Sequence, residues 1–103
     1  MGKSEANTVA WIFLAISFWD KRQVTRVEIL HSADAINHAV PLESELQLAI
    51  RVLTRQGLVN KNGKFFELTD SGRLILESAH SGAVNIFDAW KKLETAIGSL
   101  AAV

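Results

Sequence analysis

The sequence contains no cysteine and only one proline among its 103 residues. The absence of cysteine excludes a disulfide framework and thiolate metal sites and fits a reducing compartment, so we expect a cytoplasmic protein. No proline-, glycine- or serine-rich stretch divides the chain, and its length is typical of one domain. Apolar residues make up 49% of the sequence, which is enough to bury a core of ordinary size.

The sequence also has no apolar run long enough to cross a membrane. The longest run, Val9–Trp19, has about eleven residues, whereas a membrane-spanning helix needs roughly 20. It follows Glu5 and Asn7 rather than a basic segment, and no small-residue cleavage site comes after it. We therefore interpret it as a buried helix and expect no membrane partner.

Motifs of catalysis and metal binding are missing as well. The chain has no Ser/His/Asp arrangement, no phosphate-binding glycine loop and no HExxH motif. His31 and His38 are two helical turns apart, which separates their imidazoles by about 10 Å, too far to share one metal ion. We therefore expect no catalytic residues, no bound metal and no cofactor.

The first half of the chain shows three helical segments. An apolar run with a polar residue before it predicts a helix from Asn7 or Thr8 to Trp19. Thr25 and Glu28 have the spacing of a capping box, so a second helix is expected to start there and to end near Ala39. Pro41 suits the first turn of a third helix, which is expected to end at Gln56 because Gly57 suits a left-handed C-terminal residue.

The second half predicts a hairpin and two more helices. Asn62-Gly63 suits a type I′ turn between the strand segments 58–61 and 64–68. Thr69 or Asp70 is expected to cap a fourth helix that frays near His80-Ser81-Gly82. The sequence thus predicts a single domain, residues 1–103. It consists of a first helix and connection (7–24), a middle part with the second helix, the third helix, the hairpin and the fourth helix (25–76), and a C-terminal amphipathic helix (83–101).

The last helix carries an apolar stripe with heptad spacing. The stripe either packs on the first helix of the same chain or pairs with a second copy. We favour a homodimer, because the first helix offers more apolar surface than one small module covers. The interface is expected to contain Trp11, Phe18, Ile86, Trp90, Leu93, Ile97 and Leu100. The aromatic residues of these two helices either line a small-molecule pocket or form plain core, and we prefer the core.

The middle of the chain has three motifs in a recognisable order. They are the apolar face Leu46, Ile50 and Leu53, the helix end Gln56-Gly57-Leu58-Val59, and the run Phe66-Glu67-Leu68-Thr69-Asp70-Ser71-Gly72-Arg73. From Thr25 to about Leu76 the pattern resembles the winged helix-turn-helix regulators of the MarR and PadR types. The resemblance implies a mainly α fold with a short β-hairpin wing and added N- and C-terminal helices, and a dimeric DNA-binding transcriptional regulator.

The same resemblance implies that the third helix, residues 42–56, enters the major groove of double-stranded DNA while the wing lies near phosphates. The expected DNA-binding residues are Ser44, Gln47, Arg51, Arg55, Lys61, Asn62 and Lys64, with Arg22 and Arg26 as further cations. In a dimer the two third helices would occupy successive major grooves, about 34–36 Å apart, on a roughly palindromic site.

Several features of the third helix and wing depart from this pattern. Glu43 and Glu45 stand in the first helical turn, where they stabilise the helix dipole but would repel phosphate. The wing is short and lacks an arginine at its tip. Arg51 and Arg55 are one turn apart, which suits adjacent phosphates or an ordinary solvated face equally well.

The charge balance gives a further reason to consider another function. The chain has 11 basic and 11 acidic residues, so binding to nucleic acid depends on their local arrangement. The alternative is a winged-helix module that binds a protein partner instead of DNA. It would use Leu48 and Val52 on the third helix, or the apolar last helix, and exposure of Leu48 and Val52 would favour it.

Overall fold

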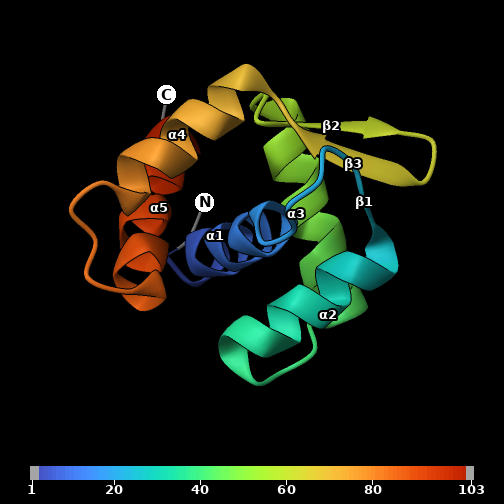
Figure 1. The fold of residues 1–103 in the computed structure, drawn as a ribbon, viewed down its shortest axis with the longest axis horizontal. Helices are drawn as coiled ribbons and strands as arrows, with labels where there is room; N and C mark the ends of the chain where they lie inside the picture. The colour runs from blue at the N-terminus through green and yellow to red at the C-terminus, as the bar shows by residue number, and fades with distance from the viewer. Residues whose placement is uncertain (1–2, 102–103) are drawn as a thin grey trace.

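The computed structural model describes residues 3–101, which form five helices and three strands (Figure 1). The elements are α1 (Lys3–Ser17), β1 (Val24–Thr25), α2 (Arg26–Asn37), α3 (Glu43–Arg55), β2 (Val59–Asn62), β3 (Phe65–Leu68), α4 (Asp70–His80) and α5 (Ile86–Ala101). The protein is mainly helical with a small antiparallel sheet, which confirms the predicted mainly α class with a short hairpin. This arrangement is compatible with a winged helix.

Helix α1 lies at the centre of the molecule, with α5 on one side and α2 and α3 on the other (Figure 1). All eight residues from Val9 to Ile16 are buried. A helix that is apolar on every face must be covered on more than one side, and three helices supply that cover. The prediction of a buried helix is therefore confirmed, and no helix within residues 3–101 is long and apolar enough to span a membrane.

The observed ends of α1 and α2 differ from the predicted ones. α1 begins four residues before Asn7, and Thr8 bonds back to the Ser4 carbonyl inside the helix instead of capping it. α1 ends at Ser17, two residues early, and the Trp19 indole donates to the Glu28 carbonyl of α2. α2 ends at Asn37 because His38 takes a left-handed conformation (φ 54°).

The start of α3 corrects the predicted role of Pro41. Pro41 is buried and precedes the N-cap residue, Leu42, so it lies outside the first turn. The Glu45 carboxylate accepts the Leu42 N–H at 2.8 Å, which fixes the helix start at Glu43. Leu42 is 66% exposed and does not belong to the core face. Gly57 has the predicted left-handed conformation, with a φ of 73°, and the helix ends at Arg55, one residue before the predicted end.

The sheet has the strand order β1-β3-β2, and β1 was not predicted. Its two residues are too few to show an alternating pattern, but Val24 is buried and pairs with Phe66. In the hairpin, Asn62 pairs with Phe65, so Gly63 and Lys64 form the loop. Only Gly63 of these two has a positive φ, which is the pattern of a type II′ turn and corrects the predicted type I′.

Thr69 ties the end of α3 to the start of α4. Its hydroxyl donates to the Gly57 carbonyl at 2.6 Å and accepts the Gly72 N–H at 3.0 Å, so Thr69 is the N-cap. Its own N–H donates to the Leu58 carbonyl at 3.0 Å. These bonds hold β2 and β3 beside the end of α3. They also show what Gly57-Leu58 and the segment from Thr69 to Gly72 do together: the two segments are hydrogen-bonded to each other.

Helix α5 begins at Ile86, three residues later than predicted. Asn85 accepts the Asp88 N–H at 3.0 Å, and the Asp88 carboxylate accepts the Val84 N–H at 3.2 Å. These two bonds cap the helix and leave residues 83–85 outside it.

We predict that Gly72→Ala destabilises the protein by about 1–3 kcal/mol, because overpacking forces the backbone to shift. A Cβ atom at residue 72 would lie 2.2 Å from the Leu58 carbonyl oxygen. The measurement is urea-induced unfolding followed by circular dichroism.

The matched control is Gly98→Ala on α5, where a new Cβ would meet only the Ala6 methyl at 4.0 Å. This variant is expected to gain about 0.5–1 kcal/mol, as alanine is a better helix former than glycine. Equal stabilities of the two variants would contradict the close approach of α4 to Leu58.

Candidate nucleic-acid interface

Helix α3 buries one face and presents the other to solvent. Its buried side chains are Leu46, Ala49, Val52 and Leu53, which follow the helical repeat and pack in the core. The opposite face exposes Glu43, Ser44, Gln47, Arg51 and Arg55. The predicted DNA-binding residues of this helix therefore share one solvent-facing surface.

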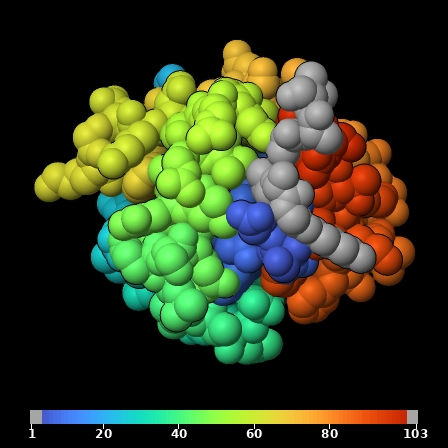
Figure 2. Space-filling view, turned by 180° about the vertical axis from the view of Figure 1, so that it is seen from behind, coloured from blue at the N-terminus to red at the C-terminus, as the bar shows by residue number. Residues whose placement is uncertain are grey.

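A groove of about 430 Å³ lies between this face of α3 and the sheet. Gln47 and Arg51 line it from the helix, Lys61 lines it from β2, and Ile50 and Phe66 contribute apolar surface. The hairpin projects beside α3, as the space-filling view from behind shows (Figure 2). The fold thus joins α3 and the hairpin into one surface, which we call the α3–hairpin face.

The acidic residues of this face are engaged within the chain. Arg26, the first residue of α2, forms a bidentate ion pair with Glu43, in which the Nη1–Oε1 distance is 3.1 Å. Glu67 on β3 accepts from Arg22 at 2.9 Å. Glu45 accepts the Leu42 N–H at the helix start. The expected repulsion between Glu43 and phosphate is therefore offset by a neighbouring positive charge.

The basic residues of the same face, in contrast, are not engaged in contacts within the described part of the chain. Arg51, Arg55, Lys61 and Lys64 are all exposed. Within residues 3–101 their side chains make no ion pair and no hydrogen bond. Asn62 and Ser44 are exposed beside them. Arg22 and Arg26, in contrast, are used in ion pairs with Glu67 and Glu43.

Leu48 and Val52 do not form an exposed apolar patch. Val52 is only 8% exposed, and Leu48 is half-buried and packs against the core. The structure therefore does not show the exposure of Leu48 and Val52 that would favour a protein-binding surface on α3.

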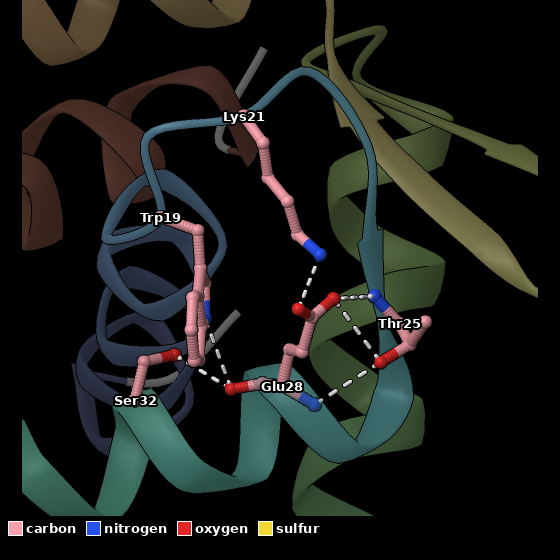
Figure 3. A network of polar contacts seen from close by, with 5 residues as sticks. All are labelled: Trp19, Lys21, Thr25, Glu28 and Ser32. Carbon is pink, nitrogen blue, oxygen red and sulfur yellow. Dashed lines mark hydrogen bonds and ion pairs between the residues drawn. The ribbon is translucent and has the colours of Figure 1, made fainter.

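A network of polar contacts holds the first turn of α2, and with it Arg26, in place (Figure 3). Glu28 accepts from the backbone N–H of Thr25 at 2.9 Å, and Thr25 accepts the Glu28 N–H at 3.3 Å, which is the predicted capping box. Lys21 forms an ion pair with the Glu28 carboxylate. Trp19 donates to the Glu28 carbonyl at 3.1 Å. The Ser32 hydroxyl lies 3.1 Å from the same carbonyl and closer, at 2.7 Å, to the Ala15 carbonyl of α1.

These contacts lower the pKa of the Glu28 carboxyl below its ordinary value of 4.5. The hydrogen bond from Lys21 is the main cause, and the Thr25 N–H adds to it, because both stabilise the ionised form. The negative charge also lies at the N-terminus of α2, where it is favourable.

The residues predicted to form a dimer interface lie mostly inside the single chain. Trp11, Trp90, Leu93 and Ile97 are buried, and Ile86 packs against the core. The Trp11 and Trp90 rings stack at 6.1 Å, and their indoles donate to the carbonyls of Ala33 and Asn7. The stripe therefore packs on the chain's own α1, which was the other interpretation of its heptad spacing.

Of the predicted interface residues only Phe18 (54%) and Leu100 (42%) are exposed. Ile86 is half-buried, and the other four are buried and therefore not available to a second copy. The stacked tryptophans fill the contact between α1 and α5, as the core interpretation of the aromatic residues predicts. No three histidine or acidic side chains within the described part of the chain come together to hold a metal ion.

Sequence reasoning did not identify the partnership between Arg26 and Glu43. The two residues are 17 positions apart, and their contact depends on how α2 packs relative to α3. The only sequence signal was their opposite charge. Comparison with known proteins adds no relative, since no family model, curated protein or solved structure matches this chain.

We predict that Glu28→Gln lowers stability at neutral pH and that its deficit shrinks in acid. Because the pKa of Glu28 is lower in the folded state, its carboxylate stabilises the fold above about pH 4.5, and this contribution is lost as the pH falls further. The measurement is urea unfolding of both proteins at about pH 7 and about pH 3.

The control is Glu77→Gln, which changes an exposed carboxylate on α4. It is expected to have little effect at either pH. A Glu28→Gln deficit of the same size at both pH values would show that the ionised carboxylate is not what stabilises this junction.

Proposed function

We propose that this protein is a winged helix-turn-helix that binds double-stranded DNA and regulates transcription. The order α1-β1-α2-α3-β2-β3 supports the fold, with β1 and β2 pairing on either side of β3. In this proposal α2 and α3 form the helix-turn-helix, joined by the turn at 38–42, and the hairpin is the wing.

The observation that carries the proposal is the unequal use of charge on the α3–hairpin face. Four cations, Arg51, Arg55, Lys61 and Lys64, are exposed and have no acidic partner within the described residues. The nearby carboxylates of Glu43 and Glu67 are paired. A chain with no net charge thus has a local positive surface, which is what binding to phosphate requires.

The shape of the face fits duplex DNA. α3 has 13 residues and is therefore about 20 Å long, and the major groove admits an α-helix. Arg51 and Arg55 would contact phosphates from the helix, and Lys61, Asn62 and Lys64 would contact them from the wing. Ser44 and Gln47, on the exposed side of the first two turns, would face base edges.

The homodimer stays a prediction. Phe18 and Leu100 are the predicted contact residues that remain exposed, so a second copy would have to use a surface other than the buried stripe of α5. A monomeric head would bind a single half-site, whereas a dimer would bind two, about 34–36 Å apart.

We predict that Arg51→Ala/Lys61→Ala weakens binding to duplex DNA and flattens its salt dependence. Removing two phosphate contacts is expected to reduce the slope of log K against log salt concentration by about 2. The measurement is fluorescence anisotropy of labelled duplex at several salt concentrations between about 50 and 200 mM.

The matched control is Lys91→Ala/Lys92→Ala on α5, which removes the same net charge from a different helix. It is expected to leave the slope unchanged. Equal weakening by both pairs of substitutions would mean that only the overall charge matters. The absence of duplex binding at low salt would contradict the proposal and favour the alternative, a winged-helix module that binds a protein partner.

A further inference from the structure

The α3–hairpin face contains a chain of three hydrogen-bonded side chains. Arg26 of α2 holds the carboxylate of Glu43 with its Nη1 and Nη2 nitrogens. The same Glu43 oxygen, Oε1, accepts from Nε2 of Gln47 at 3.1 Å. Gln47 and Glu43 are one helical turn apart on the exposed face of α3, and all three side chains line the groove beside the hairpin.

This arrangement fixes the direction of the Gln47 amide. An ionised carboxylate only accepts hydrogen bonds, so Gln47 must turn its NH₂ group toward Glu43, and a flipped amide would place two oxygens against each other. Arg26 balances the charge of Glu43. One N–H of Gln47 is thus occupied, while its other N–H and its carbonyl oxygen have no partner among residues 3–101.

We infer that Gln47 reads an adenine in the major groove and that Glu43 is the positioning residue that makes this reading selective, an inference that rests on the proposed DNA-binding function. Adenine presents one acceptor, N7, and one donor, the N6 amino group. The free N–H and free oxygen of Gln47 match this pair.

The occupied N–H also explains how guanine would be rejected. Guanine presents two acceptors, N7 and O6, in the major groove. A Gln side chain with an unoccupied NH₂ group can donate to both acceptors, but Gln47 has only one N–H to offer while Glu43 holds the other. Its oxygen would then lie against O6, and two unpaired acceptors would face each other. In this proposal Glu43 orients Gln47 for adenine, although its negative charge alone would disfavour DNA at this position.

The test is selection of binding sites from a pool of randomised duplexes, followed by competition binding with adenine or guanine at the selected position. The wild-type protein is expected to prefer adenine by roughly tenfold or more. Gln47→Ala should lose the preference at that one position and keep the salt dependence, because it removes no phosphate contact.

Glu43→Ala should lose the preference for adenine over guanine by gaining affinity for the guanine site. Binding to the guanine site should rise until the two sites differ by less than about threefold, because the released NH₂ group can donate to both guanine acceptors. Glu43→Gln should keep most of the discrimination, since its amide oxygen can still accept from Gln47. The matched control, Glu77→Ala, removes an equal charge from an exposed position on α4 and should keep the adenine preference. Circular dichroism checks that each variant is folded.

The outcomes separate this inference from the proposed function. Salt-dependent binding with no position sensitive to Gln47→Ala would overturn the inference and leave DNA binding intact. If Gln47→Ala alone removes the preference and Glu43→Ala retains it, the positioning role of Glu43 is overturned. The absence of any duplex binding by the wild-type protein would overturn both.

Discussion

The burial of α1 is the constraint on which the rest of this structure depends. Eight consecutive apolar residues, Val9 to Ile16, leave the helix no face that tolerates water, so other elements must surround it. α2 and α3 cover one side and α5 covers the other. The two buried indoles, Trp11 and Trp90, donate to backbone carbonyls of α2 and α1, which satisfies their polar groups inside the core.

The position of the α3–hairpin face follows from this core and from one junction. Packing on α1 determines which side of α3 is buried and therefore which residues face outward. Thr69 then connects the Gly57 carbonyl to the start of α4, and Gly72 lets α4 approach the Leu58 carbonyl. The hairpin between these points is held beside α3, so that Lys61 and Arg51 line the same groove.

Charge on this face is organised by pairing rather than by number. Acidic and basic residues are equal in number in the chain as a whole, yet Glu43 and Glu67 are neutralised by Arg26 and Arg22. The cations of α3 and the hairpin form no ion pair with any residue from 3 to 101. Exposed ion pairs contribute little to stability, typically about 0–1 kcal/mol. Their main consequence here is that they neutralise the acidic side chains beside the exposed cations of α3 and the hairpin, and that Glu43 orients Gln47.

The sequence by itself determined the features that depend on residues three or four positions apart, such as the Thr25–Glu28 capping box, the left-handed Gly57, the Thr69 cap and the hairpin. The helical repeat, which is local, also predicted that Ser44, Gln47, Arg51 and Arg55 share one face of α3, but it left the exposure of Leu48 and Val52 open. Only the tertiary structure decided that α5 packs on its own α1, that β1 joins the sheet, and that Arg26 meets Glu43. These contacts join residues far apart in the chain, such as Trp90 and Asn7, which are separated by 83 positions. Local propensity does not select among such long-range partners; the requirement to cover α1 and close the core does.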